Sequence, residues 1–311
     1  MIEVPTLLVL GAGASAPFGF PTGQGLKDRI CDPAYVNATK PFLASLNYDV
    51  IILDRFVDIL KRSGRSSVDA FLESRQDYVE IGKLMMANVL LECEKTDALF
   101  ENSSNRRQGS NWYDLLFSVI ADGIPFEQVG ENLNVITFNY DRSLEHYLFT
   151  ALQNSYHTAD EECAARIAEI PIIHVHGSLG RLPWQDSDGP NNVVRYDSGR
   201  THADVTSAAQ SVEIIPEATP DTAEFQRARK LMEQAKRILF LGFGFHPANL
   251  KRLMPKSERI TDDLWGTSDG LSVHRRKDAA RWRGILAEQH RHLIRTKIYD
   301  FLHNHVSLSG P

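Results

Sequence analysis

The segment PTLLVLGAGAS (Pro5–Ser15) decides the fold, because an apolar run, Pro5–Leu10, ends directly in the turn Gly11-Ala12-Gly13-Ala14-Ser15. A continuous apolar run followed by glycines is typical of a buried parallel strand that turns into a helix. Glycines also let backbone N–H groups approach a pyrophosphate, so the turn is a candidate phosphate-binding loop. Ala16 stands where the full G-x-G-x-x-G pattern has its third glycine, and the lysine of a P-loop is missing, which disfavours ATP or GTP hydrolysis.

Strand patterns alternate with helical patterns along the rest of the chain. Between Ala34 and Gln128 apolar residues recur at helical spacing, which we interpret as a helical insert (residues 34–128) with an exposed loop at Ser103–Ser110. The alternation predicts an α/β fold: one domain, residues 1–311, built on a doubly wound, Rossmann-like parallel sheet. The further strands are expected at Leu133–Phe138, Pro171–Val175, Ser211–Ile215, Arg237–Gly242 and around Leu264–Thr267. Helices are expected at Gly23–Ile30, Arg142–Gln153, Thr222–Ala235 and in the C-terminal tail.

The composition indicates a soluble globular protein. Of 311 residues, 42% are hydrophobic and 24% charged, enough for a sizeable core and a solvated surface. The net charge of −6 argues against direct nucleic-acid binding, and the basic stretch Arg275–Arg295 fits a solvated helix face. The three cysteines are far apart and form no CxxC pair, so we expect no zinc or other metal. We find no signal peptide and no run of roughly 20 apolar residues, so we expect a cytoplasmic protein without membrane contact.

Four motifs each follow a predicted strand: GAGAS (11–15), FNYD (138–141), HGS (176–178) and GFGFHP (242–247). Ligands of open parallel sheets bind outside the carboxyl ends of the strands, near the point where the strand order reverses. We therefore expect the four motifs to meet at one crevice. The prediction rests on their convergence, since a lone glycine pair is as often a tight turn without a ligand.

Asn139 and His176 are the candidate catalytic pair. An asparagine can hold a water or the hydroxyls of a ribose, and a histidine can accept a proton near neutral pH. Cleavage of a glycosidic bond to nicotinamide would need these functions. The pyridinium ring departs as a neutral molecule without help, so the enzyme has only to hold the ribose and direct a nucleophile at C1′. His174 would lie on the same face of the strand, so alternation alone does not choose between the two histidines. Asp141 would orient the site or, as we favour, cap the following helix.

GFGFHP is a candidate second nucleotide loop, with Gly242 and Gly244 as close-approach positions. Phe243 and Phe245 could equally belong to the core. Gly266 and Thr267 are candidates for a wall around the second half of a dinucleotide. The residues expected to bind the cofactor are Gly11, Ala12, Gly13, Ala14, Ser15, Asp141, Gly177, Ser178, Gly242, Gly244, Phe245, Gly266 and Thr267.

In this order, the motifs resemble those of the sirtuin-like superfamily over about Leu7–Ser272. GAGAS and the following PFGFPTGQGL (17–26) are similar to its first NAD-binding motif, FNYD to the motif that contacts the nicotinamide ribose, and HGS to the motif with the catalytic histidine. The resemblance implies that NAD is the substrate and that Asn139 and His176 are catalytic.

The chain departs from the protein deacetylase sirtuins, because it lacks the paired cysteines of their zinc module and has Tyr140 where they typically have isoleucine. It resembles instead the branch found in bacterial anti-phage defence, whose members are NAD hydrolases. This resemblance implies NAD depletion on infection, with nicotinamide and ADP-ribose as products. Uncontrolled hydrolysis would kill the host and the chain has no obvious sensor domain. We therefore expect control by homo-oligomerisation or by a separate regulatory partner such as an ATPase.

Three alternatives compete with this prediction. An NAD-dependent protein deacylase would use the same pocket, but it needs an acyl-lysine channel and a clamping domain, for which we find no candidate. A silent module that binds NAD or ADP-ribose would not need the intact Asn139 and His176. A dehydrogenase is disfavoured because Asp28 and Asp32 lie on a predicted helix rather than at the end of a second strand.

Overall fold

A six-stranded parallel sheet forms the centre of the molecule. The computed structural model describes residues 1–101, 111–185, 192–214, 221–255, 260–281 and 293–309. The strands are arranged in the order β3-β2-β1-β4-β5-β6, and every pair is parallel. This order confirms the doubly wound, Rossmann-like α/β fold, with the reversal point between β1 and β4. The bounds are β1 Thr6–Leu10, β2 Leu133–Thr137, β3 Ile172–His174, β4 Arg237–Leu241, β5 Leu264–Thr267 and β6 Leu293–Ile294.

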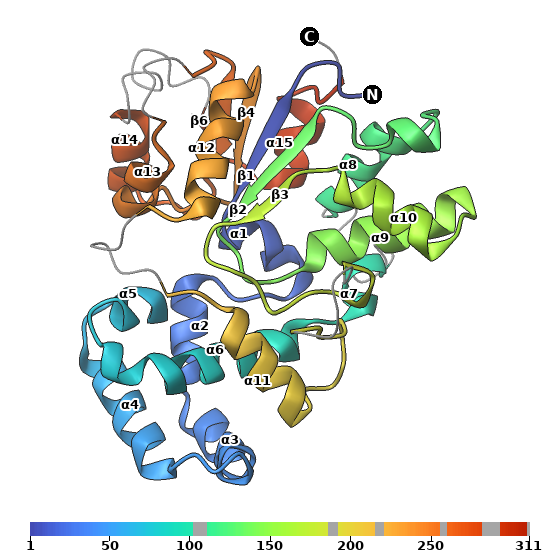
Figure 1. The fold of residues 1–311 in the computed structure, drawn as a ribbon. Coiled ribbons are helices and arrows are strands. Elements are labelled where there is room, and N and C mark those ends of the chain that lie inside the picture. The colour runs from blue at the N-terminus through green and yellow to red at the C-terminus, as the bar shows by residue number, and fades with distance from the viewer. Residues whose placement is uncertain (102–110, 186–191, 215–220, 256–259, 282–292, 310–311) are drawn as a thin grey trace.

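Helices cover both faces of the sheet, and the alternation of β1 shows why. Leu8 and Leu10 belong to one buried core, together with residues of α8, α9, α10 and α15. Leu7 and Val9 point to the opposite face and belong to a second core with α12 and α13. All five residues of β1 are buried, as expected of a strand covered on both sides. Figure 1 shows the two layers on either side of the strands.

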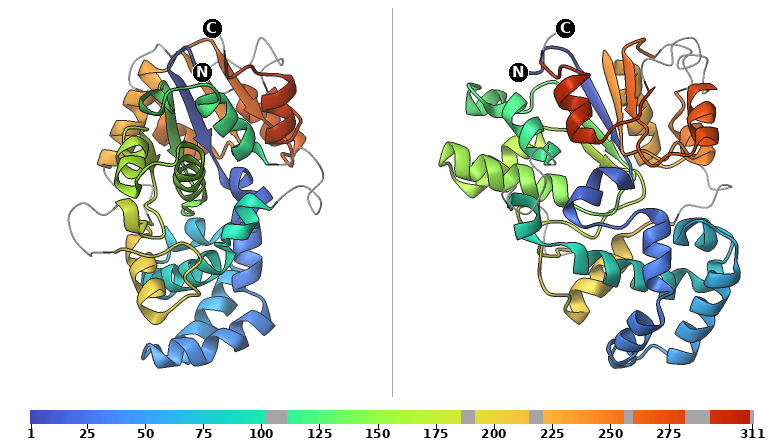
Figure 2. Two further views of the ribbon diagram at one scale, coloured as in Figure 1. Left: turned by 90° about the vertical axis from the view of Figure 1, so that its right-hand side faces the viewer. Right: turned by 180° about the vertical axis from the view of Figure 1, so that it is seen from behind.

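A second group of helices lies beyond the carboxyl ends of the strands (Figures 1 and 2). We call α2–α6 together with α11 the helical group, because α6 contacts α2, α4, α5 and α11. By contrast α8, although it falls within residues 34–128, packs beside the sheet against α9 and α15. The helices of the group are α2 Gly23–Ile30, α3 Pro33–Ser45, α4 Val50–Arg62, α5 Val68–Leu72, α6 Val79–Cys93 and α11 His202–Ser211. The others are α1 Ala12–Ser15, α7 Thr96–Phe100, α8 Trp112–Ala121, α9 Ser143–Tyr156, α10 Asp160–Ala168, α12 Ala223–Gln234, α13 Pro247–Leu253, α14 Val273–Arg281 and α15 Ile298–Asn304.

The strand prediction for Ser211–Ile215 is wrong. The preceding residues form α11, which begins with a capping box in which Thr201 and Asp204 each accept from the other's backbone N–H. Val212 makes only an isolated bridge to Gly177. The segment therefore supports the turn after β3 without adding a strand to the sheet. Position 215 and the loop predicted at Ser103–Ser110 lie outside the described residues.

The short edge strand β6 was not predicted from the sequence. It pairs with β5 through two residues. A two-residue strand carries too little alternation to be recognised. In the described part of the chain, no helix combines the length and apolar character needed to cross a membrane.

Candidate functional site

The backbones of the GAGAS and GFGFHP turns are in direct contact at the reversal point of the sheet. A Cβ atom at Gly11 would lie 2.7 Å from the Gly242 carbonyl oxygen, and one at Gly242 would lie 2.3 Å from the Ala14 nitrogen. Gly242 also has a φ of +57°, in the left-handed region that favours glycine. The ends of β1 and β4 can therefore approach this closely only because both turns carry glycine.

The contact between the two turns also engages two backbone N–H groups, which are therefore not available to donate to a bound phosphate. Gly11 N donates to Leu241 O at 3.1 Å, and Gly13 N donates to Gly242 O at 3.0 Å. Ala14 N donates back to Gly11 O at 2.8 Å. The glycines of GAGAS thus serve first to join the two strand ends, while Ala12 N makes no such cross-strand bond to any described residue.

The Gly242 turn is supported from β5 and from the core. Thr267 is buried, and its hydroxyl accepts from Gly242 N at 2.9 Å. The Phe245 ring is 1% exposed and packs on Phe240, and its edge lies 3.3 Å from the Cβ position of Gly266. Phe245 is thus a core side chain, so that contact with a nucleotide is left to the backbone of its loop. Gly244 is exposed and has open space around it.

Asn139 is fixed by two hydrogen bonds from its side-chain amide. Nδ2 donates to Gly11 O and to Ser15 Oγ, each at 3.0 Å. A backbone carbonyl only accepts, so the amide nitrogen must face Gly11 and the Oδ1 oxygen must point the other way. Asn139 is 8% exposed, and Oδ1 has no hydrogen-bond partner among the described residues. The free group of Asn139 is therefore an acceptor.

Ser15 joins Asn139 to Asp141. Its hydroxyl accepts from Asn139 and hydrogen bonds to the Asp141 carboxylate. Asp141 also accepts from the backbone N–H of Ser143, the first residue of α9, at 3.3 Å and from the Ser143 hydroxyl. The cap residue of α9 is Arg142, so Asp141 bonds to the helix start without being its N-cap. Burial raises the pKa of Asp141, and the hydrogen bonds from Ser143 and Ser15 oppose that shift.

His176 lies at the end of β3 in an aromatic environment. Its ring centroid is 5.6 Å from that of Phe138 and 5.7 Å from that of Phe225. Burial, reinforced by the positive charge of Arg252, lowers the pKa of His176 to about 4. Within the described ranges no side chain or backbone group hydrogen bonds to its ring. The imidazole is therefore neutral near pH 7 and has a free nitrogen lone pair.

His174 has the opposite character. One ring nitrogen, Nδ1, lies 2.9 Å from Asn139 O, and the other, Nε2, lies 2.6 Å from the Glu145 carboxylate. The structure thus distinguishes two histidines that strand alternation left equivalent. His174 is fully engaged within the protein, whereas His176 is free to meet a ligand.

The two residues after His176 differ in where they lie. Gly177 has a φ of +71°, and a Cβ there would lie 2.1 Å from Ser211 O, so this position requires glycine. Ser178 donates to Gly180 O at 3.2 Å and lines a cavity of about 540 Å³ at the outer edge of β3, together with His174. The structure therefore places Ser178 in a cavity to which Asn139 and His176 do not contribute.

Helices predicted as an insert contact each of the first two motifs. The Trp112 indole N–H of α8 donates to Ala14 O at 2.9 Å, and both side chains are buried. The Tyr140 hydroxyl donates to the Asp69 carboxylate of α5. These bonds hold the motif loops against the helices around them.

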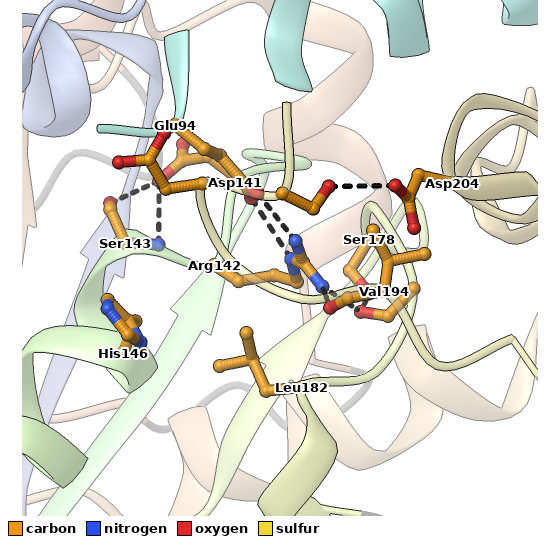
Figure 3. Close-up of polar contacts among 12 residues, drawn as sticks. Glu94, Asp141, Arg142, Ser143, His146, Ser178, Leu182, Val194 and Asp204 are labelled. Atoms are coloured by element: carbon orange, nitrogen blue, oxygen red, sulfur yellow. Dashed lines mark hydrogen bonds and ion pairs between the residues drawn. The ribbon is translucent and has the colours of Figure 1, made fainter. Parts of the chain in front are cut away.

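A buried ion pair makes a third connection (Figure 3). Arg142 donates to Glu94, at the end of α6, through Nε at 3.0 Å and Nη2 at 2.6 Å. Its Nη1 donates to Val194 O at 2.6 Å, in the loop that follows the HGS motif. Burial raises the pKa of Glu94 to about 7 against the lowering effect of Arg142. The pair thus joins the end of β2 to the helical group and to the loop after β3.

Four residues that contribute to this site were not considered as parts of it from the sequence: Glu94, Trp112, Arg142 and Glu145. One signal was available, because Glu94 follows directly on the apolar stretch of α6, and a carboxylate in such surroundings needs a partner. The others carry no local signal, because their partners are 29 to 98 residues away along the chain.

No cluster of three or more potential metal ligands occurs among the described residues. No curated protein matches the chain. A model of a protein family does match, over residues 133–290, and its description is SIR2-like domain. The match begins with β2 and includes both Asn139 and His176 as well as the Gly242 and Thr267 turns. The chain therefore belongs to the SIR2-like domain family, whose chemistry uses NAD.

Proposed function

We propose that this protein is an NAD glycohydrolase, which cleaves the bond between nicotinamide and ribose to give nicotinamide and ADP-ribose. The observation that carries the proposal is the pairing of a free acceptor with a free base at adjacent strand ends. Asn139 Oδ1 follows β2, and the neutral His176 imidazole follows β3. Both lie beyond the carboxyl ends of the strands, where ligands of this fold bind.

The leaving group of this reaction needs no proton from the enzyme. The C1′–N bond breaks with its electron pair going to the pyridinium nitrogen, so nicotinamide departs neutral, and water then adds to C1′ of the oxocarbenium-like ribose. Asn139 Oδ1 accepts a hydrogen bond from that water or from a ribose hydroxyl. His176 takes the proton that the water loses. A base with a pKa of about 4 suffices, because bonding to the electron-poor carbon makes the water strongly acidic.

The dinucleotide would be held by the contact between the two glycine turns. Gly11, Gly13 and Gly242 let the two turns meet backbone to backbone, and the pyrophosphate would bind over this junction, where no side chain of these residues stands in its way. The Ala12 N–H and the backbone of the exposed Gly244 would contact it.

The proposed cellular role follows from the resemblance to the anti-phage branch. NAD hydrolysis would deplete the cell of NAD on infection, under the control of a homo-oligomer or of a separate regulatory partner. The buried connections from the helical group to Tyr140 and Arg142 support such control, because a shift of these helices would move the loop that carries Asn139.

The proposal is tested by incubating the purified chain with NAD and measuring both products by chromatography. Equimolar nicotinamide and ADP-ribose, at a rate that an added acetyl-lysine peptide does not increase, is the expected result. If nicotinamide appears only when the peptide is present, with transfer of the acetyl group to ADP-ribose, the protein is a deacylase and the proposal fails.

A further inference from the structure

His174 and Glu145 form a buried pair that the proposed reaction does not use. The His174 side chain is 13% exposed and that of Glu145 is 6% exposed, and they meet at 2.6 Å. Glu145 lies in the first turn of α9, and His174 is the last residue of β3. The pair therefore joins the edge strand to the helix that follows the FNYD motif.

The hydrogen bonds of His174 require an additional proton. Asn139 O only accepts, so Nδ1 must carry a hydrogen. An ionised Glu145 also only accepts, so Nε2 must carry a hydrogen too, and His174 is then an imidazolium. In a neutral His174, the Nε2 lone pair would face the Glu145 carboxylate. Strong bonding on both sides thus depends on one proton held within the pair.

The surroundings of His174 favour its protonated form overall. Burial opposes a charge on His174, but Glu145, the bond to Asn139 O and the nearby Asp141 together raise the pKa of His174 above its usual value. From the other elements, Arg142, Arg181 and Arg227 line the same cavity as His174. Arg142 is paired with the buried Glu94, whereas Arg181 and Arg227 are exposed to solvent, which screens their charge.

The bond to Asn139 O completes the positioning of Asn139. The side-chain amide is held by Gly11 and Ser15, and the backbone carbonyl is held by His174. Two independent fixed points leave the Asn139 residue little freedom to rotate. The direction of its free Oδ1 is therefore set from both sides.

We propose that His174 and Glu145 are positioning residues, which share one proton and hold the Asn139 carbonyl so that Asn139 Oδ1 points at the reacting ribose. This inference deepens the proposed function and rests on it. It predicts that Asn139 is held most firmly below the pKa of His174. The hold should weaken as the pH rises through that value, because the Nε2 lone pair then faces the Glu145 carboxylate and the ring is no longer fixed on that side.

The first test does not involve NAD. The pKa of His174 is measured by NMR in protein labelled at histidine, with the ¹³C shift of the Asn139 carbonyl followed in the same titration. In the wild type we expect His174 to titrate above 6.5 and the Asn139 shift to follow it. In Glu145→Gln, burial remains and the carboxylate is gone, so His174 should titrate below 6.5. The proposal would be overturned if His174 titrates below 6.5 in the wild type, or if the ¹³C shift of the Asn139 carbonyl does not change as His174 titrates.

The second test separates positioning from general stability. His174→Ala should lower kcat for NAD hydrolysis at least about tenfold with KM changed less than about threefold, since ground-state binding of NAD remains. His174→Gln, which keeps a neutral donor toward Asn139, should restore part of the loss. The matched control is His146→Gln on α9, a half-buried histidine that bonds Thr96 and stacks on Tyr196. A loss of kcat in the control equal to that in His174→Ala would show a merely structural effect and refute the positioning role.

The pH profile supplies the sharpest readout. Wild-type kcat should fall on the alkaline side of the His174 titration. This fall of kcat at alkaline pH should be absent in Glu145→Gln. The amide that replaces the Glu145 carboxylate can donate to a neutral Nε2 and keep the ring in place. If kcat of Glu145→Gln still falls at the same alkaline pH as in the wild type, the proposal is contradicted. If the wild type neither binds nor hydrolyses NAD, the proposed function fails, and the NMR titration still decides whether the pair holds Asn139.

Discussion

Replacing Gly242 by alanine should separate the two strand ends on which the crevice depends. The added Cβ would lie 2.3 Å from Ala14 N and from the Gly13 carbonyl carbon, both of them backbone atoms that cannot rotate away. Alanine at a φ of +57° costs about 1–2 kcal/mol, and forcing apart packed backbone costs about 1–3 kcal/mol. The Gly13 N to Gly242 O bond, worth about 1 kcal/mol, is weakened as well. We expect a loss of about 3–5 kcal/mol in the free energy of unfolding, out of a total of about 5–15 kcal/mol.

The measurement is urea unfolding of Gly242→Ala, with NAD binding followed by calorimetry. Gly244→Ala is the matched control, two residues on in the same loop, with no positive φ and no atom within 4 Å of its added Cβ. The free energy of unfolding of the control should lie within about 0.5 kcal/mol of the wild-type value. If the two variants unfold at the same urea concentration, the close approach of β1 and β4 is not as described, and the reasoning about the crevice is wrong.

Three further predictions concern the site itself. Since burial lowers the pKa of His176 from 6.5 to about 4, its base form persists as the pH falls, and kcat/KM should stay level from about pH 6 to 5 and decline near pH 4; an acid-side decline centred on 6.5 would contradict this. Asn139→Asp should lower the free energy of unfolding by about 1–3 kcal/mol and abolish hydrolysis, because a carboxylate cannot donate to Gly11 O; wild-type stability in urea would refute the assigned amide orientation. Trp112→Phe removes the donor to Ala14 O and should cost about 1 kcal/mol, measured by the same unfolding assay, with weaker NAD binding; unchanged unfolding and binding would show that this bond does not support the loop.

The sheet could be predicted because its strands carry strong local signals. β1 and β4 are continuous apolar runs that end in glycine turns, and the alternation of strands with helices then indicates a doubly wound parallel sheet. α11 could not be separated from its loop by apolar spacing, although Thr201 and Asp204 form a capping box that marks its start.

The site was predictable only in part, for a physical reason. Motifs at strand ends are local, so Asn139 and His176 could be chosen from the sequence. The difference between His174 and His176 lies in contacts with Glu145 and with aromatic rings from other elements. Likewise the sequence around Phe245 suggests a ligand-facing side chain, but Phe245 is buried in the core that α12 and α13 form with the sheet. Such contacts are made by tertiary packing, which spacing along the chain does not encode.

The most direct test of the account compares NAD binding and NAD cleavage in the same samples of wild type, Asn139→Ala and His176→Ala. Calorimetry measures binding, and chromatography measures nicotinamide and ADP-ribose. We predict that all three proteins bind NAD and that only the wild type releases the two products in equal amounts. Cleavage by either variant at the wild-type rate would contradict the account, as would a wild type that binds NAD and leaves it intact.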